Sequence, residues 1–502
     1  MMKLKVLCDV MDVLEVIGST DDSISALHCD SRRVEEGTLF FALSGAVVDG
    51  SRFIPQAIVA GAIAVVTEQL LDQVPSGVTV IRVGNVRRSM AFCAALFYGN
   101  PSHAIPVVGV TGTNGKTTTS YLLESIFKQA GYRPAVFGTV DYRFESARVP
   151  AANTTPESLD LQQLMARFRA DGADAMILEV SSHALKQHRA DGVAFDAVVF
   201  TNLTPEHLDY HPDMADYYQS KSRLFTALRG TARAIVNGDD AYGAQLAGEL
   251  PDCTVFGAER GDVFARRVKM SRTGTSAVFA TPAGDLAIDS RLIGGFNLSN
   301  LLAAVATTAS LDIPLAKIAA GIKGAPQVPG RVESVDNDRG ILALVDYAHT
   351  GDALRQVLKT LSGIEAGRRI TVVGCGGDRD RSKRPVMAAA AVELSDIVLL
   401  TSDNPRTEDP LQILQQMRAG AISRGIAECS PDQLDRWGEK VFCVVPDRRL
   451  AIETAVRVAK SGDIILVAGK GHEDYQILGV QKVHFDDREE LFAALTDGGG
   501  QR

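Results

Sequence analysis

The chain has 502 residues, of which 46% are hydrophobic and 23% charged, and its formal net charge at pH 7 is −9. This length predicts about three domains, because one hydrophobic core rarely grows so large. The acidic balance argues against general nucleic-acid binding, which needs a basic surface to neutralise phosphates.

The cysteines and the N-terminal residues bear on the cellular compartment in which the protein is expected. The seven cysteines are scattered and include no CxxC pair, so neither a disulfide framework nor a structural zinc site is expected. Residues 1–18 contain no long apolar region, and no run of about 18 apolar residues occurs in the chain. We therefore expect a cytoplasmic protein without membrane insertion.

The first hundred residues alternate between short apolar strands and helical stretches. Strands are expected at 38–43, 62–68 and 78–83. Pro and Gly cluster at 99–106, and such clusters interrupt regular structure. We place the first domain at 1–104.

A second alternation of strands and helices begins at residue 107. Short continuous apolar runs predict buried strands, which are expected at 175–180, 196–203 and 232–237. Helical segments separate them, a pattern that predicts a parallel sheet covered by helices. A helix is expected to begin near Asn297, and a break at 323–331 closes a domain of residues 105–330.

The alternation restarts in residues 331–502, which we expect to form a third domain. Its strands are expected at 341–347, 369–375, 395–403 and 463–469, with a helix at 353–361. In such α/β units the functional side chains follow the carboxyl ends of the strands. The expected fold class is therefore α/β with three domains.

The segment GTNGKTTT, residues 112–119, is typical of a phosphate-binding loop. A helix is expected to begin near Lys116, and the amides at a helix N-terminus attract anions. Gly112 and Gly115 would let the backbone approach phosphate oxygens, and Thr117 or Thr118 would hold Mg²⁺. The strict P-loop pattern has a Gly where Val110 stands, so a tight turn in a Rossmann-like sheet is the alternative.

Two polar segments follow the next two strands. Glu179 ends the first strand and is either a Mg²⁺ ligand or a buried carboxylate paired with a lysine. In the second segment, His207 and His211 have a spacing that could bind zinc, although the Glu of the metalloprotease motif is missing. Lys221 lies in a helical stretch, where a lysine is ordinarily a surface residue.

The order of eight motifs resembles the Mur ligases of bacterial cell-wall synthesis. The motifs are GTNGKTTT, LEVSSHALKQHR, TNLTPEHLDYH, GGFNLSNLLAA, VDYAHT, GCGGDRDRSKRP, SDNPRTEDP and AGKGHEDYQ. The resemblance spans nearly the whole chain. It implies an N-terminal UDP-binding domain, a central P-loop-type ATPase domain with a parallel sheet, and a C-terminal Rossmann-like domain that binds the incoming amino acid.

The same resemblance implies an ATP-dependent amide ligase. Its substrates would be ATP, UDP-N-acetylmuramoyl-L-alanyl-D-glutamate and meso-2,6-diaminopimelate, with Mg²⁺ as the cofactor. Transfer of the γ-phosphoryl group would convert the D-glutamate γ-carboxylate into an acyl phosphate, which the amine attacks. No nucleic-acid partner is implied, and a monomer is expected.

Nucleotide and metal roles are carried over onto the matching positions. The phosphate loop would comprise Gly112, Thr113, Asn114, Gly115, Lys116, Thr117 and Thr118. Further ATP contacts would come from Asn297, Arg331 and Asp346, although Asn297 could equally cap the helix. Lys116, Glu179, His207 and Lys221 would be catalytic. The metal ligands would be Thr117, Glu179, His207 and Lys221, the last as a carbamate that binds a second Mg²⁺.

The positions that match the UDP-sugar-peptide site lie in three segments. They are Cys29, Ser31, Ala46, Val47, Val48, Asn153, Thr154, Thr155, Ser181, Gln187 and Arg189. Ala46–Val48 replace a more polar triplet of the family, which leaves backbone contacts to uracil. Without the resemblance, Asn153–Thr155 would be an ordinary turn before a proline.

The C-terminal domain carries the family's diaminopimelate signature. The matching residues are Arg379, Asp403, Asn404, Pro405, Arg406, Gly469 and Glu473. Diaminopimelate has a second carboxylate that lysine lacks, and an Arg can bind it through two hydrogen bonds. We assign that contact to Arg406. From the residues alone, 403–406 would be a strand-to-loop turn.

Four other functions compete with this one. A lysine-adding ligase shares most motifs, but Asp403–Arg406 argues against it; a folate polyglutamate synthase would not explain the N-terminal segment. A P-loop switch or motor would hydrolyse nucleotide without an amino acid. A zinc hydrolase using His207 and His211 would need no ATP.

Overall fold

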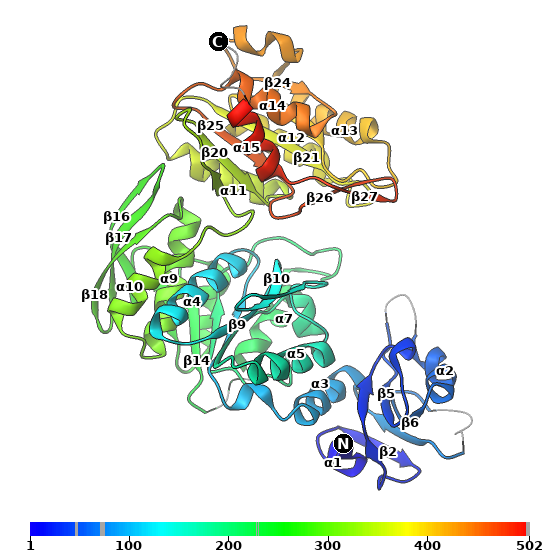
Figure 1. Cartoon of the computed structure of the whole chain (residues 1–502). Helices are drawn as coiled ribbons and strands as arrows, with labels where there is room; N and C mark the ends of the chain where they lie inside the picture. Colours follow the sequence, from blue (N-terminus) through cyan, green and yellow to red (C-terminus); the bar gives the residue numbers. More distant parts are fainter. Residues whose placement is uncertain (46–48, 71–75, 227, 229, 498–502) are drawn as a thin grey trace. The chain divides into compact units, whose positions relative to one another are not determined.

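Buried apolar runs form strands throughout the chain, as the sequence predicts. The computed structural model describes residues 1–45, 49–70, 76–226, 228 and 230–497 (Figure 1). Its residue contacts separate two units. One comprises 1–266, 279–286 and 299–324, and the other comprises 267–278, 287–298 and 325–502. The domain boundaries at 104/105 and 330/331 stay predictions.

The N-terminal sheet has five strands among the described residues, in the order β2-β7-β6-β5-β4. Along β5, Leu39 and Phe41 face one core and Phe40 the other, because successive strand side chains point to opposite faces. The strands of this sheet are β2 (Val13–Ile17), β4 (Ala26–His28), β5 (Thr38–Phe41), β6 (Ala62–Thr67) and β7 (Thr79–Val83), and the helices α2 (Ile54–Val59) and α3 (Val86–Phe97) belong to the same part of the chain. The other elements are β1 (Met2–Lys3), α1 (Leu4–Cys8), β3 (Ser23–Ile24), η1 (Ser31–Arg33), η2 (Gly50–Phe53) and η3 (Pro101–His103).

The central sheet has the order β11-β10-β9-β12-β8-β13-β14-β15-β16-β17-β18 within the described chain. Its strands are β8 (Val107–Thr111), β9 (Pro134–Phe137), β10 (Asp141–Phe144), β11 (Ala147–Pro150), β12 (Ala175–Glu179), β13 (Ala197–Phe200), β14 (Arg233–Asn237), β15 (Thr254–Gly257), β16 (Val263–Ser271), β17 (Gly274–Thr281) and β18 (Gly284–Ser290). The six strands from β9 to β15 in this order are parallel. The predicted parallel sheet is thus confirmed at its centre, whereas the antiparallel β10 and β11 were not expected.

The register of β12, β8 and β13 determines where their carboxyl ends lie. Glu179 pairs with Val110, and Phe200 pairs with Thr111. The residues that follow these strands therefore meet at one edge of the sheet. This edge holds the phosphate loop.

Seven helices follow strands of the central sheet in the described residues. They are α4 (Lys116–Ala130), α5 (Ser158–Ala170), α6 (Ser182–Lys186), α7 (Met214–Thr226), α8 (Ala241–Glu249), α9 (Gly295–Ser310) and α10 (Leu315–Gly324). The predicted start of α4 at Lys116 is confirmed. The helix expected near Asn297 begins two residues earlier, so Asn297 lies inside α9 and is not its cap.

The C-terminal sheet has the order β19-β20-β25-β21-β22-β24-β23 within the described chain (Figure 1). Leu344 faces a core with α11, α12 and α13, whereas Ala343 and Val345 face a core with α14 and α15. Helices thus cover both faces, and the predicted Rossmann-like α/β layering is confirmed. The strands are β19 (Glu333–Val335), β20 (Leu342–Asp346), β21 (Arg369–Cys375), β22 (Ile397–Ser402), β23 (Ala427–Glu428), β24 (Val441–Val444) and β25 (Ile464–Ala468). The helices are α11 (Gly351–Ser362), α12 (Lys383–Leu394), α13 (Pro410–Ile422), α14 (Arg448–Val458) and α15 (Asp487–Asp497).

Two further features complete this unit. The 3-10 helix η4 (Pro431–Arg436) precedes β24, and a hairpin of β26 (Tyr475–Leu478) and β27 (Gln481–His484) follows β25. A buried ion pair joins α14 to α15: Arg448 Nε and Nη2 each donate to an Asp487 oxygen at 2.7 Å, and both side chains are 0% exposed. Arg448 also donates to the Ala468 carbonyl at 3.0 Å, which links the pair to the end of β25.

Replacing Asp487 by Ala should destabilise the C-terminal unit strongly. The change leaves the Arg448 charge buried without its partner, at a cost of about 3–5 kcal/mol in free energy of unfolding. Glu490→Ala is the matched control, because its partner Arg449 is 59% exposed and such pairs contribute about 0–1 kcal/mol. Chemical denaturation measures both; equal losses for the two variants would contradict the assignment.

Candidate active site

The loop between β8 and α4 requires glycine at two positions. Gly112 has φ of 149°, and an added Cβ would lie 1.9 Å from Thr201 Oγ1. Gly115 has φ of 88°, and its Cβ would lie 2.4 Å from Asn300 Oδ1. Both positions thus combine a left-handed backbone with close neighbours, which only glycine tolerates.

The segment after β13 fixes the shape of this loop. Asn202 accepts hydrogen bonds from the Thr113 amide through its carbonyl and from the Asn114 amide through its side chain, each at 2.9 Å. Thr201 Oγ1 donates to the Asn114 carbonyl at 2.6 Å. The loop is therefore held before any ligand arrives, and Asn202 is a supporting residue that the sequence did not reveal.

The N-terminal end of α4 points its amides out of the helix. The first bond of the helix runs from the Thr119 amide to the Gly115 carbonyl at 2.9 Å, so the preceding amides lie at the helix end. Lys116 Nζ lies over the loop and donates to the carbonyls of Gly112 at 2.7 Å and Thr113 at 2.8 Å. Thr118 is buried on the same turn. This arrangement can bind phosphate groups.

Glu179 is a buried carboxylate surrounded by hydroxyl groups. Its side chain accepts hydrogen bonds from Thr117 at 3.0 Å, Thr139 at 2.8 Å and Ser120 at 3.3 Å. The alternative of a Glu179–lysine pair is wrong, because no cationic side chain pairs with Glu179 within the part of the chain that the structure describes. Thr139 and Ser120 were not predicted, since neither lies in a recognisable motif.

Lys221 is buried rather than exposed, which corrects the ordinary reading of a helical lysine. Its Nζ donates to the Gly112 carbonyl at 2.9 Å and lies 4.8 Å from the centre of the Tyr217 ring. Burial, reinforced by the nearby positive charge of Lys116, holds the pKa of Lys221 well below its usual value. The ammonium form of Lys221 is therefore less favoured than that of an exposed lysine.

The arrangement of His211 contradicts the alternative of a zinc site made by His207 and His211. This side chain is fully buried, with Nδ1 2.6 Å from Asp216 Oδ2 and Nε2 3.0 Å from Ser182 Oγ, so both ring nitrogens are engaged. His207 has φ of 58°, and its ring centre lies 4.9 Å from that of His183. Burial, then the neighbouring histidines, lowers the pKa of His183 to about 4.

The predicted sugar-peptide residues adjoin Glu179 through backbone contacts. Thr155 is fully buried, and its hydroxyl donates to the Glu179 carbonyl at 2.9 Å and accepts from the Ser181 amide at 3.1 Å. Thr154 Oγ1 lies 3.1 Å from Thr139 Oγ1, and the Asn153 carbonyl accepts from Tyr142 at 2.5 Å. The segment is thus fixed to the end of β12.

Arg189 is the centre of a small polar network in the same region. Its Nη1 donates to the Thr155 carbonyl at 3.1 Å and its Nη2 to Gln187 Oε1 at 2.7 Å. Its Nε lies 2.9 Å from Glu157, which also pairs with Arg87 at 3.2 Å. Glu157 therefore orients Arg189, a role that no sequence motif indicated.

The predicted uridine residues lie in the N-terminal sheet. Ser31 Oγ donates to Gln56 Oε1 at 3.1 Å. Burial, with a smaller effect from Glu157, raises the pKa of the Cys29 thiol to about 11. Ala46, Val47 and Val48 lie outside the described residues.

The second unit holds the remaining nucleotide positions. Asp346 ends β20, and its carboxylate accepts from the amides of Val332 and Ala348, both at 2.8 Å. Burial raises the pKa of Asp346, although Arg331 opposes the shift. The Arg331 guanidinium lies 4.8 Å from the centre of the Tyr347 ring. Asn297 Nδ2 donates to the Ile293 carbonyl at 2.9 Å.

The predicted diaminopimelate residues converge after β22 and β25. Asn404 Nδ2 donates to Glu473 Oε2 at 2.9 Å, and a Cβ at Gly469 would lie 2.9 Å from Asp403 Oδ2. Arg406, which follows the buried Pro405, has φ of 53°, and its Nη1 donates to the Gly377 carbonyl at 2.8 Å.

Arg379 approaches this group from the loop after β21. Its side chain is exposed and donates to the Asp378 carbonyl at 3.2 Å. A Cβ at Gly376 would lie 2.9 Å from Arg406 Nη1 and 3.9 Å from Arg379 Cγ. The two guanidinium side chains therefore flank the same glycine.

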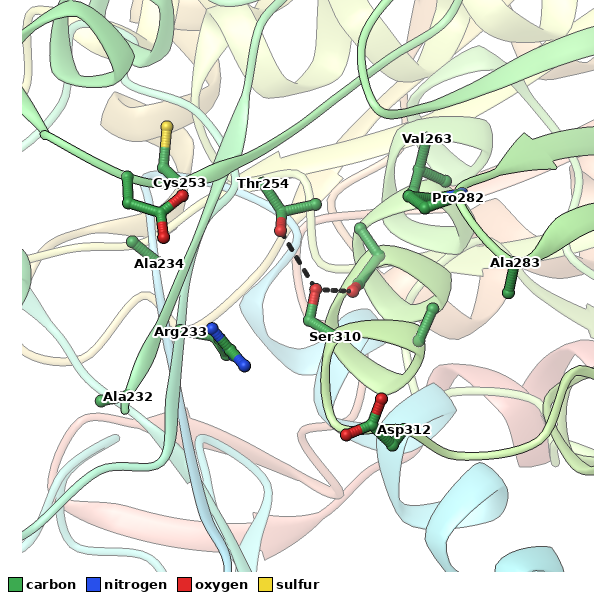
Figure 2. Close-up of a pocket in the computed structure, with 13 residues that line it drawn as sticks. Ala232, Arg233, Ala234, Cys253, Thr254, Val263, Pro282, Ala283, Ser310 and Asp312 are labelled. Atoms are coloured by element: carbon green, nitrogen blue, oxygen red, sulfur yellow. Dashed lines mark hydrogen bonds between the residues drawn. The ribbon is translucent and has the colours of Figure 1, made fainter. Parts of the chain in front are cut away.

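A separate cavity of about 410 Å³ lies where β14 and β15 begin (Figure 2). Thr254 Oγ1 and Ser310 Oγ lie 3.1 Å apart in its wall, and Arg233 also lines it. Parallel strands begin at the edge of the sheet opposite to the phosphate loop. None of the predicted site residues that the structure describes lines this cavity.

Three family models match the chain. They are the Mur ligase family catalytic domain over residues 23–98, the Mur ligase middle domain over 110–308 and the Mur ligase glutamate ligase domain over 330–471.

Full-length proteins and a solved structure are also similar. A Geobacter metallireducens protein named UDP-N-acetylmuramoyl-L-alanyl-D-glutamate–2,6-diaminopimelate ligase is 50% identical over 505 residues, which cover 99% of each chain. A Geobacter sulfurreducens protein of that name is 50% identical over 503 residues, covering 98% of this chain and 99% of its own. A solved structure of a ligase of that name has a TM-score of 0.72 at 32% identity and covers 100% of both chains.

No helix in the described ranges is long and apolar enough to cross a membrane.

Gly112→Ala should weaken nucleotide binding at least about tenfold, or ~1.4 kcal/mol, because the added Cβ displaces the loop from Thr201. Gly131→Ala is the matched control: Gly131 also has a positive φ, of 99°, but its Cβ would meet no atom within 4 Å. Calorimetric titration with ADP measures both dissociation constants. Unchanged affinity in Gly112→Ala would contradict the assigned loop.

Proposed function

The chain belongs to the Mur ligase family, and we propose that it joins 2,6-diaminopimelate to UDP-N-acetylmuramoyl-L-alanyl-D-glutamate at the expense of ATP. The observation that carries this proposal is the 50% identity, over 99% of both chains, to a ligase of that name. The geometry at the ends of β8, β12 and β22 supports it.

The reaction needs ATP because a carboxylate is a poor electrophile. Transfer of the γ-phosphoryl group to the D-glutamate γ-carboxylate gives an acyl phosphate and ADP. The amine then attacks the carbonyl carbon, and phosphate leaves as the amide bond forms. Catalysis of this kind depends on positioning and on neutralising charge.

The phosphate loop would bind the nucleotide. The amides at the start of α4 and the Lys116 ammonium would contact phosphate oxygens, with Asn297, Arg331 and Asp346 as further ATP-binding residues. The ammonium lies within 2.8 Å of two loop carbonyls, so a small movement would place it on a phosphate. Positive charge there offsets the charge that develops on the transferred group.

Thr117 and Glu179 fit a Mg²⁺ ion. Both provide oxygen atoms, which hard cations prefer, and the Glu179 carboxylate is buried among hydroxyls rather than neutralised by a cationic side chain. His207 would be a further ligand. When bound, Mg²⁺ supplies positive charge to the phosphate oxygens.

Lys221 fits the carbamate that the family resemblance implies. A neutral amine can add to CO₂, forming an N–C bond and releasing a proton to solvent. Burial lowers the pKa of Lys221, which makes the neutral amine easier to reach, and the product is an anion close to Lys116. Carbamate oxygens would then be available to a second Mg²⁺.

The predicted residues that follow β22 and β25 would select the amine substrate. Arg406 would bind the carboxylate that distinguishes diaminopimelate from lysine, and Arg379 would bind another carboxylate. Asp403 and Glu473 would accept hydrogen bonds from the ammonium groups, Asn404 would lie beside the substrate and hold Glu473, and Gly469 leaves room beside Asp403. The N-terminal positions Cys29 and Ser31, with Asn153–Thr155, Ser181, Gln187 and Arg189, would contact the nucleotide-sugar peptide.

We further propose a monomeric, cytoplasmic enzyme of three domains, 1–104, 105–330 and 331–502. This division assigns one small-molecule substrate to each domain: the UDP-sugar peptide, ATP and the amino acid. Small-angle scattering would test the monomer.

The decisive assay for this function follows ADP release. Release should require both the UDP-linked dipeptide and meso-diaminopimelate, because phosphoryl transfer without an acceptor amine cannot turn over. Nucleotide hydrolysis that proceeds without either substrate would instead indicate a switch or motor. Lysine supporting the higher rate would indicate the lysine-adding ligase.

Arg406→Ala should reduce discrimination between meso-diaminopimelate and L-lysine by about 2–4 kcal/mol, the scale of a desolvated charge pair. The ratio of kcat/KM for the two amines measures it. Arg381→Ala is the control, because Arg381 is 68% exposed and pairs with Glu408. An unchanged ratio in Arg406→Ala would contradict the assignment.

Lys221→Ala should lower kcat at least about a hundredfold, or ~2.7 kcal/mol. Formate or acetate should restore part of the rate by supplying the missing carboxylate. Lys128→Ala, which removes a half-exposed lysine of the same unit, should leave kcat unchanged. Normal turnover in Lys221→Ala would exclude the carbamate.

A further inference from the structure

Lys470 is a fully buried cation for which the chemistry above has no role. It lies in the motif AGKGHEDYQ, between Gly469 and Glu473, just after β25. Its side chain is 0% exposed. An ammonium persists in such a place only where polar partners replace its water.

The Lys470 ammonium contacts residues that the proposed function assigns to the amine site. Its Nζ donates to the Tyr475 carbonyl and lies 3.4 Å from Glu473 Oε2, 3.5 Å from Asn404 Oδ1 and 3.9 Å from Asp403 Oδ1. One cation is thus shared by two carboxylates that come from different strand ends, β22 and β25. Without a cation between them, these carboxylates would repel each other.

The same contacts orient the Asn404 amide. Its Oδ1 accepts from the Ile477 amide at 2.9 Å and faces Lys470, while its Nδ2 donates to Glu473 Oε2. Because the oxygen side faces two donors and the nitrogen side faces a carboxylate, only one orientation of the amide satisfies both. Lys470 therefore contacts both Asn404 and Glu473, which the proposed function assigns to the amine site.

We propose that Lys470 is a positioning residue for the amine substrate: it offsets the repulsion between Glu473 and Asp403 and fixes Asn404, so that the pocket presents ready acceptors to the substrate's ammonium group. This inference rests on the proposed function. It extends the amine site to a residue that acts only through its neighbours.

The electrostatic surroundings of Glu473 support this role. Burial, followed by repulsion from Asp403, raises the pKa of Glu473, and Lys470 opposes the shift. Tyr347, Tyr475 and Arg448 are further titratable groups that interact with Glu473, and Arg448 is already paired with Asp487. Loss of Lys470 should therefore let Glu473 take up a proton at higher pH.

The test compares Lys470→Met with wild type by ADP release, with ATP and the UDP-linked dipeptide saturating. KM for meso-diaminopimelate should rise at least about tenfold, while KM for ATP stays within about twofold. The acidic limb of kcat/KM for diaminopimelate should move to higher pH by at least about one unit. Lys470→Arg keeps the charge and should keep the limb near its wild-type position.

Lys482→Met is the matched control. Lys482 is exposed, and its Nζ lies 3.7 Å from the centre of the Tyr475 ring. The substitution therefore removes a second cation beside the same tyrosine. Its kinetics should equal those of wild type. If Lys470→Met does not fold, Lys470→Gln replaces it, since Gln can still donate to the Tyr475 carbonyl.

The outcomes separate this inference from the function on which it rests. If wild-type ADP release does not require diaminopimelate, the proposed function fails. If release requires it but the Lys470 variants keep the wild-type KM and pH profile, only the positioning role fails. An equal rise in the KM values for ATP and diaminopimelate would also overturn it, because that pattern indicates general damage.

Discussion

The parallel register of β12, β8 and β13 is the constraint on which the rest of the site depends. It sets Glu179 beside Val110 and Phe200 beside Thr111, so the residues after three strands arrive at one edge. The phosphate loop, its supporting residues Thr201 and Asn202, and the buried carboxylate then need only short-range contacts. A slip of one residue would turn each side chain to the other face of the sheet.

Among the described residues at this edge, the lysines and the carboxylate do not pair with one another. Lys116 and Lys221 both donate to the Gly112 carbonyl, while Glu179 accepts hydrogen bonds from the hydroxyls of Thr117, Thr139 and Ser120. Burial, followed by the nearby positive charge of Lys116, lowers the pKa of Lys221. The arrangement therefore suits a site that binds both a polyphosphate and a cation. The phosphate would supply negative charge to the lysines, and the cation would supply positive charge to Glu179.

The sequence predicts the parts of this structure that depend on local pattern. Buried strands appear as apolar runs, and the loop from Gly112 to Gly115 appears because glycine is needed for its backbone. It does not predict contacts that form only through folding. Lys221 looks like a surface residue of an amphipathic helix until α7 packs it under the phosphate loop. Thr139 reaches Glu179 from the turn before β10, an antiparallel strand that the alternating pattern gave no reason to expect. Lys470 and Glu157 likewise acquire partners from distant segments.

The central claim is that ATP activates the substrate carboxylate as an acyl phosphate at the edge formed by β12, β8 and β13. The most direct test uses substrate labelled with ¹⁸O in the D-glutamate γ-carboxylate. After turnover, mass spectrometry should find one labelled oxygen in the released phosphate and the other in the new amide carbonyl. Released phosphate that carries no label would contradict the claim, because the carboxylate oxygen would then never have been bonded to phosphorus.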